Sequence, residues 1–264
     1  IHTQISEPEY RTGFDRNFWI WEKYQDGIPY LLVADVARGD GADSSVFHIL
    51  RTDTMQVVAE YQGKPNLDHY ANILNDAGRE YGNCLLVVEN IGIGISVCEK
   101  LRDLEYPNLY YSIKGTHEYV DSLSGEYNTN AVIGFTTSSK TRPLIVAKLE
   151  EYIRNKIIKT RSQRLFSELK TFIWNNGKPQ AMRSYHDDLI MSLAIACWVR
   201  DTALEVSERD VEYKKAMLDG MFCASKTINT AIKGMNEYQR RETFEEKYEK
   251  EINVTKDFPW IFKG

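Results

Sequence analysis

The sequence predicts an α/β fold in which three antiparallel strands and then parallel strands form a mixed sheet flanked by helices. Two apolar runs, at residues 30–36 and 84–89, have the composition of strands that are buried on both faces. Between them, residues 67–81 carry apolar side chains at helical spacing. Strand segments come first and then alternate with helices, which is the order expected when helices cover a mixed sheet.

The first half of the chain gives the order of the sheet. We expect a short edge strand at residues 18–21, and then strands at 30–36, 45–50 and 56–61, the last two joined by a hairpin turn at 52–54. Further along we expect a helix at 67–81 closed by Gly82, a strand at 84–89, a helix near 96–104 and a strand at 109–113. Three antiparallel strands followed by alternating helix and strand is the order of an RNase H-like fold.

The second half is predicted to be mainly helical. Residues 114–140, rich in Ser, Thr, Gly and Asn, suit a functional loop or a small hairpin. We then expect helices at 143–155 and 162–169, a hairpin around Asn175-Asn176-Gly177, and a buried helix from about residue 186. We divide the chain into an N-terminal extension (1–28) with the possible edge strand, an RNase H-like domain (29–200) and a charged, largely helical tail (201–264).

Composition excludes several classes of protein. With 264 residues, 42% of them hydrophobic and 27% charged, the chain is neither disordered nor fibrous. No apolar run approaches the ~20 residues of a membrane span, and no secretory leader is evident. The four cysteines have no CxxC spacing, so we expect reduced core residues rather than a zinc site. The first residue is Ile1 rather than Met, and we expect a piece of a longer protein. A net charge of −5 decides little about nucleic acid, since basic contacts can be local.

Several acidic residues occur within or next to apolar segments, where burying a charged carboxylate is energetically unfavourable. Asp35 interrupts one apolar strand, Glu89 ends another, and Asp187 and Asp188 open an apolar helix. If the strands are neighbours and the helix crosses their ends, these carboxylates converge and repel one another unless a cation binds. Oxygen ligands favour Mg²⁺ or Mn²⁺, and two such ions about 4 Å apart can hydrolyse a phosphodiester. In this scheme Asp35 bridges both ions, Glu89 holds one and Asp188 the other.

Each acid taken alone has a simpler explanation. A single acid at a strand end is usually a cap or a surface charge. Asp187 and Asp188 also suit a helix N-terminus, where carboxylates accept backbone N–H bonds. That explanation covers one of this pair and does not cover Asp35. Three acids in this order therefore favour the metal site.

Three motifs resemble those of the nuclease domain of tailed-bacteriophage large terminase subunits. The first motif is DVARGDGADS at 35–44, the second is VEN at 88–90 with the glycines that follow, and the third and most specific is YHDDLIMSL at 185–193. The resemblance runs from about residue 18 to residue 200. Holliday-junction resolvases share the order of the carboxylates but not the Tyr-His-Asp-Asp-Leu sequence.

The resemblance implies a DNA-packaging endonuclease that cuts concatemeric viral DNA with little sequence specificity. It implies Asp35, Glu89 and Asp188 as metal ligands, with Asp187 as a close competitor and Asp43 as an auxiliary ligand. The implied partners are double-stranded DNA, an ATPase motor domain, the small terminase subunit and the portal, in the host cytoplasm. The chain has no Gly-x-x-x-x-Gly-Lys-[Ser/Thr] loop, so we do not expect it to hydrolyse ATP itself.

Residues beyond the carboxylates are open to two interpretations. Basic residues between 140 and 170 form either a surface that contacts the DNA backbone or a solvated helix face; the DNA-binding candidates are Lys140, Arg142, Lys148 and Arg154. His186 either orients a carboxylate or substrate, or is structural. Gly39, Gly41, Gly92 and Gly94 are expected to let the backbone turn sharply beside the metals.

Two other functions remain open at this point. A junction resolvase or transposase would share the fold and the acids. A non-catalytic module that docks on a portal or capsid would explain the charged tail, although all three acidic positions are filled.

Overall fold

A computed structural model describes residues 5–13, 15–38, 43–115, 118–175 and 177–204 of the chain. Its main sheet has six strands in the order β1-β2-β5-β4-β3-β6. The strands are β1 (Tyr10–Thr12), β2 (Phe18–Ile20), β3 (Tyr30–Asp35), β4 (Ser45–Arg51), β5 (Gln56–Gly63) and β6 (Leu85–Val88). Only the β3–β6 pair is parallel, and the other pairs are antiparallel. The predicted mixed α/β sheet is therefore confirmed.

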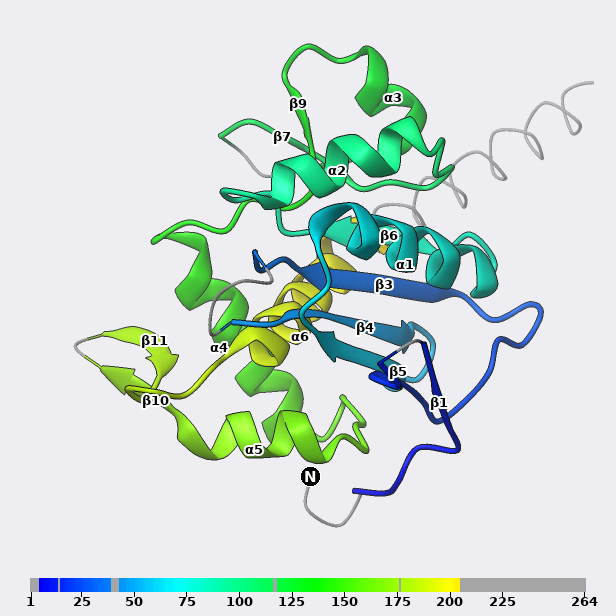
Figure 1. The fold of residues 1–264 in the computed structure, drawn as a ribbon. Helices are drawn as coiled ribbons and strands as arrows, with labels where there is room; N and C mark the ends of the chain where they lie inside the picture. The colour runs from blue at the N-terminus through cyan, green and yellow to red at the C-terminus, as the bar shows by residue number, and fades with distance from the viewer. Residues whose placement is uncertain (1–4, 14, 39–42, 116–117, 176, 205–264) are drawn as a thin grey trace, which may run out of the picture. The chain divides into compact units, whose positions relative to one another are not determined.

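Helices cover both faces of this sheet (Figure 1). The helices α1 (Leu67–Glu80) and α2 (Gly94–Asp103) lie on one face, and α4 (Thr141–Arg154), α5 (Gln163–Thr171) and α6 (Asp188–Val199) lie on the other. Side chains alternate along a strand, so β3 supplies both cores. Leu31 and Val33 pack with α4 and α6, whereas Leu32 and Ala34 pack with α1 and α2. A strand buried on both faces explains the unbroken apolar run that the sequence shows.

The N-terminal edge differs from the prediction. The strand expected at residues 18–21 forms as β2, but it pairs on one side with β5 and on the other with β1. The edge strand is therefore β1, whose three residues are all exposed and carry no apolar pattern that would reveal a strand. Residues 10–12 and 18–20, assigned to an N-terminal extension, join the main sheet.

The segment after α2 forms a small second sheet. Its strands are β7 (Tyr111–Ile113), β8 (Tyr119–Val120) and β9 (Ala131–Ile133), in the order β8-β7-β9, with the short helix α3 (Ser122–Tyr127) between β8 and β9. Single bridges join this segment to β6, where Leu86 pairs with Leu109, and to Glu89, which pairs with Phe135. The strand predicted at 109–113 thus begins beside β6 and continues away from it.

The last described segments carry a hairpin and the buried helix. The hairpin, β10 (Phe172–Asn175) and β11 (Lys178–Ala181), projects from the end of α5 (Figure 1). The helix α6 is buried almost all round, as its apolar sequence predicts, and continues into a π-helical turn, Arg200–Leu204. Among the described residues, no helix has both the length and the apolar character needed to cross a bilayer.

Two sequence-based predictions reach beyond the described residues. The cysteines at 84, 98 and 197 are buried and free, as expected, while Cys223 lies outside the described part of the chain. The predicted tail (201–264) is described only as far as residue 204, and Gly39 and Gly41 are also outside.

Candidate metal centre

Asp35 and Glu89 lie side by side at one end of the main sheet. Asp35 is the last residue of β3, and Glu89 directly follows β6. The strands are parallel and Ala34 is paired with Val88, so the next residue of each strand emerges at the same edge. The Glu89 N–H donates to the Ala34 carbonyl at 2.9 Å, which extends the pairing by one residue. Both carboxylates are half-buried.

The helix α6 brings Asp188 to the same edge. Asp188 is its first residue, and its Oδ2 accepts a hydrogen bond from the Ser44 N–H at 2.9 Å, so the loop before β4 is tied to the helix start. One turn further on, Ser192 Oγ donates to the Val33 carbonyl at 2.8 Å and contacts His48 Nδ1 at 3.1 Å. These buried polar contacts fix how far α6 can slide along β3, and thereby where Asp188 lies.

The closeness of these buried carboxyl groups makes the ionised forms of Asp35 and Asp188 unfavourable. Burial, together with contact with the Glu89 carboxylate and the charge of Asp188, holds the pKa of Asp35 well above its usual range. Burial is also the main reason why the pKa of Asp188 rises to about 6, helped by the charges of Asp43 and Asp187 and opposed by the Ser44 N–H and His186. A divalent cation would relieve this repulsion.

A second group of ligand atoms adjoins Asp188. One ligand atom each from Asp43, His186 and Asp188 lie within 4.8 Å of one another. His186 Nδ1 is 3.1 Å from Asp43 Oδ1, so the imidazole is oriented by that carboxylate. Asp188 therefore lies between Asp43 and His186 on one side and Asp35 and Glu89 on the other. His186, expected either to orient a carboxylate or touch substrate or to be structural, lies in this group and offers a nitrogen atom to it.

Asp187 points to different partners. Its Oδ2 receives the Arg142 guanidinium at 2.5 Å and the Ala181 N–H at 3.1 Å. Arg142 also donates from Nε to the Pro179 carbonyl at 3.1 Å. These contacts join the starts of α4 and α6 to the β10–β11 hairpin.

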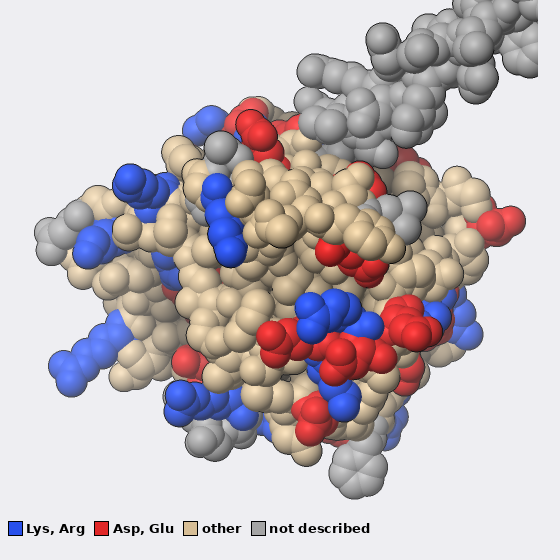
Figure 2. All heavy atoms as spheres, turned by 90° about the horizontal axis from the view of Figure 1, so that it is seen from above, with Lys and Arg blue, Asp and Glu red and all other residues tan. Residues whose placement is uncertain are grey.

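Three of the four basic residues expected to contact DNA are paired with carboxylates. Arg142 is paired with Asp187 as described, and Arg154 Nη1 lies 3.1 Å from Glu150. Lys148 Nζ lies 3.0 Å from both Glu151 and Asp201. Lys140 is exposed at the N-terminus of α4. On the face shown in Figure 2, basic and acidic side chains are interspersed around a mostly neutral centre.

Sequence reasoning missed Glu168, which holds the start of α6. Its buried Oε2 accepts from the N–H groups of Leu189 and Ile190, at 3.0 and 3.2 Å, and so caps α6 from the neighbouring helix. Burial raises the pKa of Glu168 to about 8. The available signal was its position: Glu168 follows Leu165 by three residues, on the apolar face of α5.

The two glycines after Glu89 serve different purposes. Gly92 has a left-handed backbone (φ +59°) with open space where a Cβ would be. Gly94 packs so close to Glu89 that a Cβ would stand 1.9 Å from the Glu89 carbonyl oxygen. Glycine thus eases the turn at residue 92, as the sequence suggested, whereas at residue 94 it allows the close approach to Glu89.

Comparison with solved structures identifies the fold. The large terminase nuclease of thermophilic phage G20c with bound magnesium is 19% identical, with a TM-score of 0.56 over 74% of this chain and 93% of that chain. The same nuclease with bound cobalt gives 0.55, at 19% identity over 74% and 93%. The Thermus phage P74-26 large terminase nuclease domain gives 0.53, at 19% over 74% and 90%.

The fold is that of the large terminase nucleases. No protein-family model matches the sequence. The similarity confirms the RNase H-like mixed sheet that the order of strands and helices predicts. At this level of identity it establishes the fold, and the activity has to be inferred from the site.

Proposed function

We propose that this chain is a divalent-metal-dependent endonuclease that cuts concatemeric viral DNA during genome packaging. The observation that carries the proposal is the convergence of Asp35, Glu89 and Asp188 from three separate elements, where burial and mutual repulsion raise the pKa values of Asp35 and Asp188. Structural ion pairs do not need such an arrangement, whereas metal centres do. The shared fold with terminase nucleases, one of them with bound magnesium, supports the same conclusion.

The side chains present fit two Mg²⁺ or Mn²⁺ ions. Asp35 and Glu89 form one oxygen-rich group, Asp43 and His186 form another, and Asp188 is common to both. Carboxylate oxygens suit Mg²⁺ and Mn²⁺, and an imidazole nitrogen suits Mn²⁺ better than Mg²⁺. Bound ions of this kind activate water and stabilise the charge that develops on a phosphodiester.

The residues of the chain supply position and charge. The ends of β3 and β6 hold Asp35 and Glu89 rigidly, because both strands are buried on both faces. The Ser44 N–H and the Glu168 cap hold Asp188 at its place in front of them. Asp187 is the weaker candidate ligand, since its carboxylate is taken up by Arg142.

The wider setting is part of the proposal. The nuclease domain would span residues 29–200 together with β1 and β2 from the N-terminal segment (1–28), and the tail (201–264) would follow it. Lys140, Arg142, Lys148 and Arg154 would contact double-stranded DNA at the start of α4 and along it, and Lys140 and Arg154 are the exposed members of this set. An ATPase motor, a small terminase subunit and a portal would act with this chain in the host cytoplasm.

Cleavage of supercoiled plasmid in Mn²⁺ tests the proposal. The unmodified chain should nick and linearise the plasmid, Asp35→Asn should cut at least about 100-fold more slowly, and a chelator should stop cutting. Asp76→Asn, on the exposed face of α1, is the matched control and should cut like the parent. Cutting that persists in Asp35→Asn or in chelator would refute the metal centre. Preferential cutting of branched DNA would favour a junction resolvase, and strand joining would favour a transposase.

A further inference from the structure

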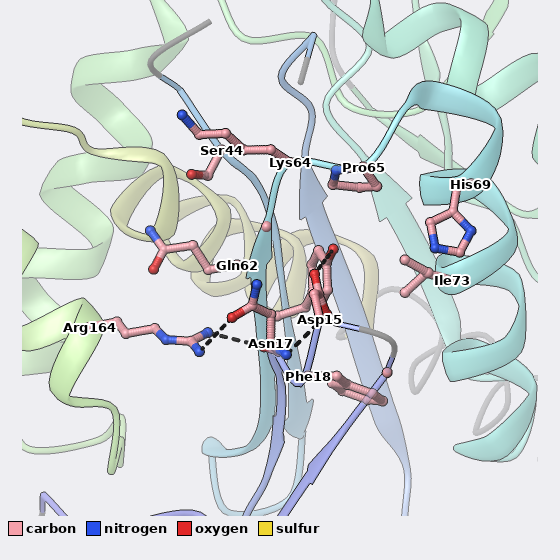
Figure 3. Close-up of a pocket in the computed structure, with 13 residues that line it drawn as sticks. Asp15, Asn17, Phe18, Ser44, Gln62, Lys64, Pro65, His69, Ile73 and Arg164 are labelled. Carbon is pink, nitrogen blue, oxygen red and sulfur yellow. Dashed lines mark hydrogen bonds between the residues drawn. The ribbon is translucent and has the colours of Figure 1, made fainter. Parts of the chain in front are cut away.

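A cavity lies beside the proposed metal centre. Its volume is about 660 Å³, which is within the range of ~300–1,000 Å³ typical of small-ligand sites. The ends of β2, β4 and β5, the first turns of α1, and Arg164 of α5 surround it (Figure 3). We call it the strand-end pocket; the lining residues used below are Phe18, Ser44, Lys64, Pro65, His69 and Ile73.

Ser44 connects this pocket to the carboxylates. Ser44 lines the pocket, and its backbone N–H donates a hydrogen bond to Asp188 Oδ2 at 2.9 Å. The preceding residue, Asp43, belongs to the group with His186. The strand-end pocket therefore adjoins the proposed ligands, because Ser44 lines the pocket and directly follows Asp43 in the chain.

The rim of the pocket is basic. Lys64 and His69 are both exposed, and in Figure 3 the Lys64 side chain extends toward Ser44. Deeper in, Arg164 donates to the Asn17 carbonyl at 3.1 Å and lies 4.0 Å from Glu60 Oε1. The one acid of the lining, Asp15, accepts from Tyr61 at 3.0 Å and from the Asn17 N–H at 3.1 Å. Lys64 thus brings a basic side chain to the mouth, which suits contact with a phosphate.

The opposite wall is apolar and the floor is kept open by a glycine. Phe18, Pro65 and Ile73 present apolar surface to the cavity. Gly63 forms part of the floor, and a Cβ there would stand 2.3 Å from Tyr61 Oη. A cavity with a cationic rim beside an apolar wall matches a nucleotide, whose phosphate is charged and whose base and sugar have apolar faces.

We propose that the strand-end pocket binds one nucleotide of a DNA strand next to the phosphate that is cut. Its phosphate lies against Lys64 and its base or sugar against Ile73. This inference rests on the proposed nuclease function. It adds a nucleotide-binding position to the DNA contacts proposed for the basic residues of α4.

The test measures binding of a fluorescein-labelled single-stranded oligonucleotide to the full chain by anisotropy, over a range of salt concentrations, with Ca²⁺ in place of Mg²⁺ to slow cutting. Lys64→Ala should weaken binding about fivefold at low salt and reduce the slope of log K against log salt by about 0.7, since one phosphate contact is lost. Ile73→Ala should weaken binding about threefold with an unchanged slope, because it removes only apolar contact. Lys23→Ala is the matched control: Lys23 is exposed and directly follows Glu22, whose N–H donates to the Val58 carbonyl, about 15 Å along β5 from the pocket.

Competition and cutting assays separate the possible outcomes. A deoxynucleoside 5′-monophosphate should displace the oligonucleotide at least about tenfold more effectively than inorganic phosphate. Equal displacement by phosphate, absence of binding by the parent, or variants at Lys64 and Ile73 that bind like Lys23→Ala would each overturn the pocket. Plasmid cutting by the same preparations tests the nuclease separately. If the chain binds the oligonucleotide through the pocket but does not cut plasmid, the nuclease function is refuted and the pocket proposal stands. If the chain cuts plasmid while both pocket variants bind normally, the pocket proposal is refuted and the nuclease function stands.

Discussion

Replacing Asp188 by asparagine should stabilise the metal-free protein at high pH. The pKa of Asp188 is about 6 in the folded protein, against an ordinary value of 3.8. A carboxyl whose folded pKa is raised contributes stability below its unfolded pKa and loses that contribution as the pH rises through the folded value. At ~1.36 kcal/mol per pH unit, ionised Asp188 costs the fold about 3 kcal/mol above pH 7. Asparagine keeps an oxygen that can accept from Ser44.

Urea unfolding in chelator, followed by tryptophan fluorescence, measures this cost. The difference in unfolding free energy between Asp188→Asn and the parent should grow in favour of the variant by about 2 kcal/mol from pH 4.5 to pH 8. Asp76→Asn, which is exposed, should show no such growth. Added Mn²⁺ should then raise the thermal midpoint of the parent at pH 8 and leave that of Asp188→Asn unchanged. A difference that does not change with pH would refute the electrostatic account of this site.

Three further substitutions test how the centre is held. Gly94→Ala should cost about 1–3 kcal/mol and weaken the Mn²⁺-induced thermal shift, because its Cβ would displace the Glu89 carbonyl; Gly92→Ala, with open space around it, should cost about 1–2 kcal/mol and spare metal binding. Glu168→Ala should destabilise by about 2–4 kcal/mol in urea titrations, since two N–H groups of α6 lose their acceptor, whereas Glu168→Gln should stay within about 1 kcal/mol of the parent at pH 7. Arg142→Ala should lower the thermal midpoint by an amount corresponding to about 1–3 kcal/mol, because it leaves a half-buried carboxylate unpaired; a smaller effect than that of Lys140→Ala would contradict the pairing.

The sequence predicts the parts of the fold and site that depend on where apolar strands end. Asp35 and Glu89 each terminate an apolar run, and parallel strands place their ends at one edge, so their proximity follows from the pattern alone. The order of helices and strands likewise fixes the sheet. Contacts between distant segments leave no such pattern. The sequence gives no reason for β1 to pair outside β2, or for Arg142 to point to Asp187 rather than to solvent.

The choice between Asp187 and Asp188 illustrates where sequence reasoning ends and packing decides. Asp187 is the N-cap of α6 and Asp188 its first residue, so their sequence context is nearly the same. The buried contacts of α6 set the rotation: Ser192 against Val33 on β3, and the helix cap from Glu168. With that rotation, Asp188 faces the sheet end and Ser44, while Asp187 faces Arg142 and the hairpin. The side chains that turn Asp188 rather than Asp187 toward the proposed site therefore lie in the core and are not themselves proposed ligands. Substitutions at Ser192 or Glu168 should disturb metal binding by changing the orientation of α6 rather than by removing a ligand.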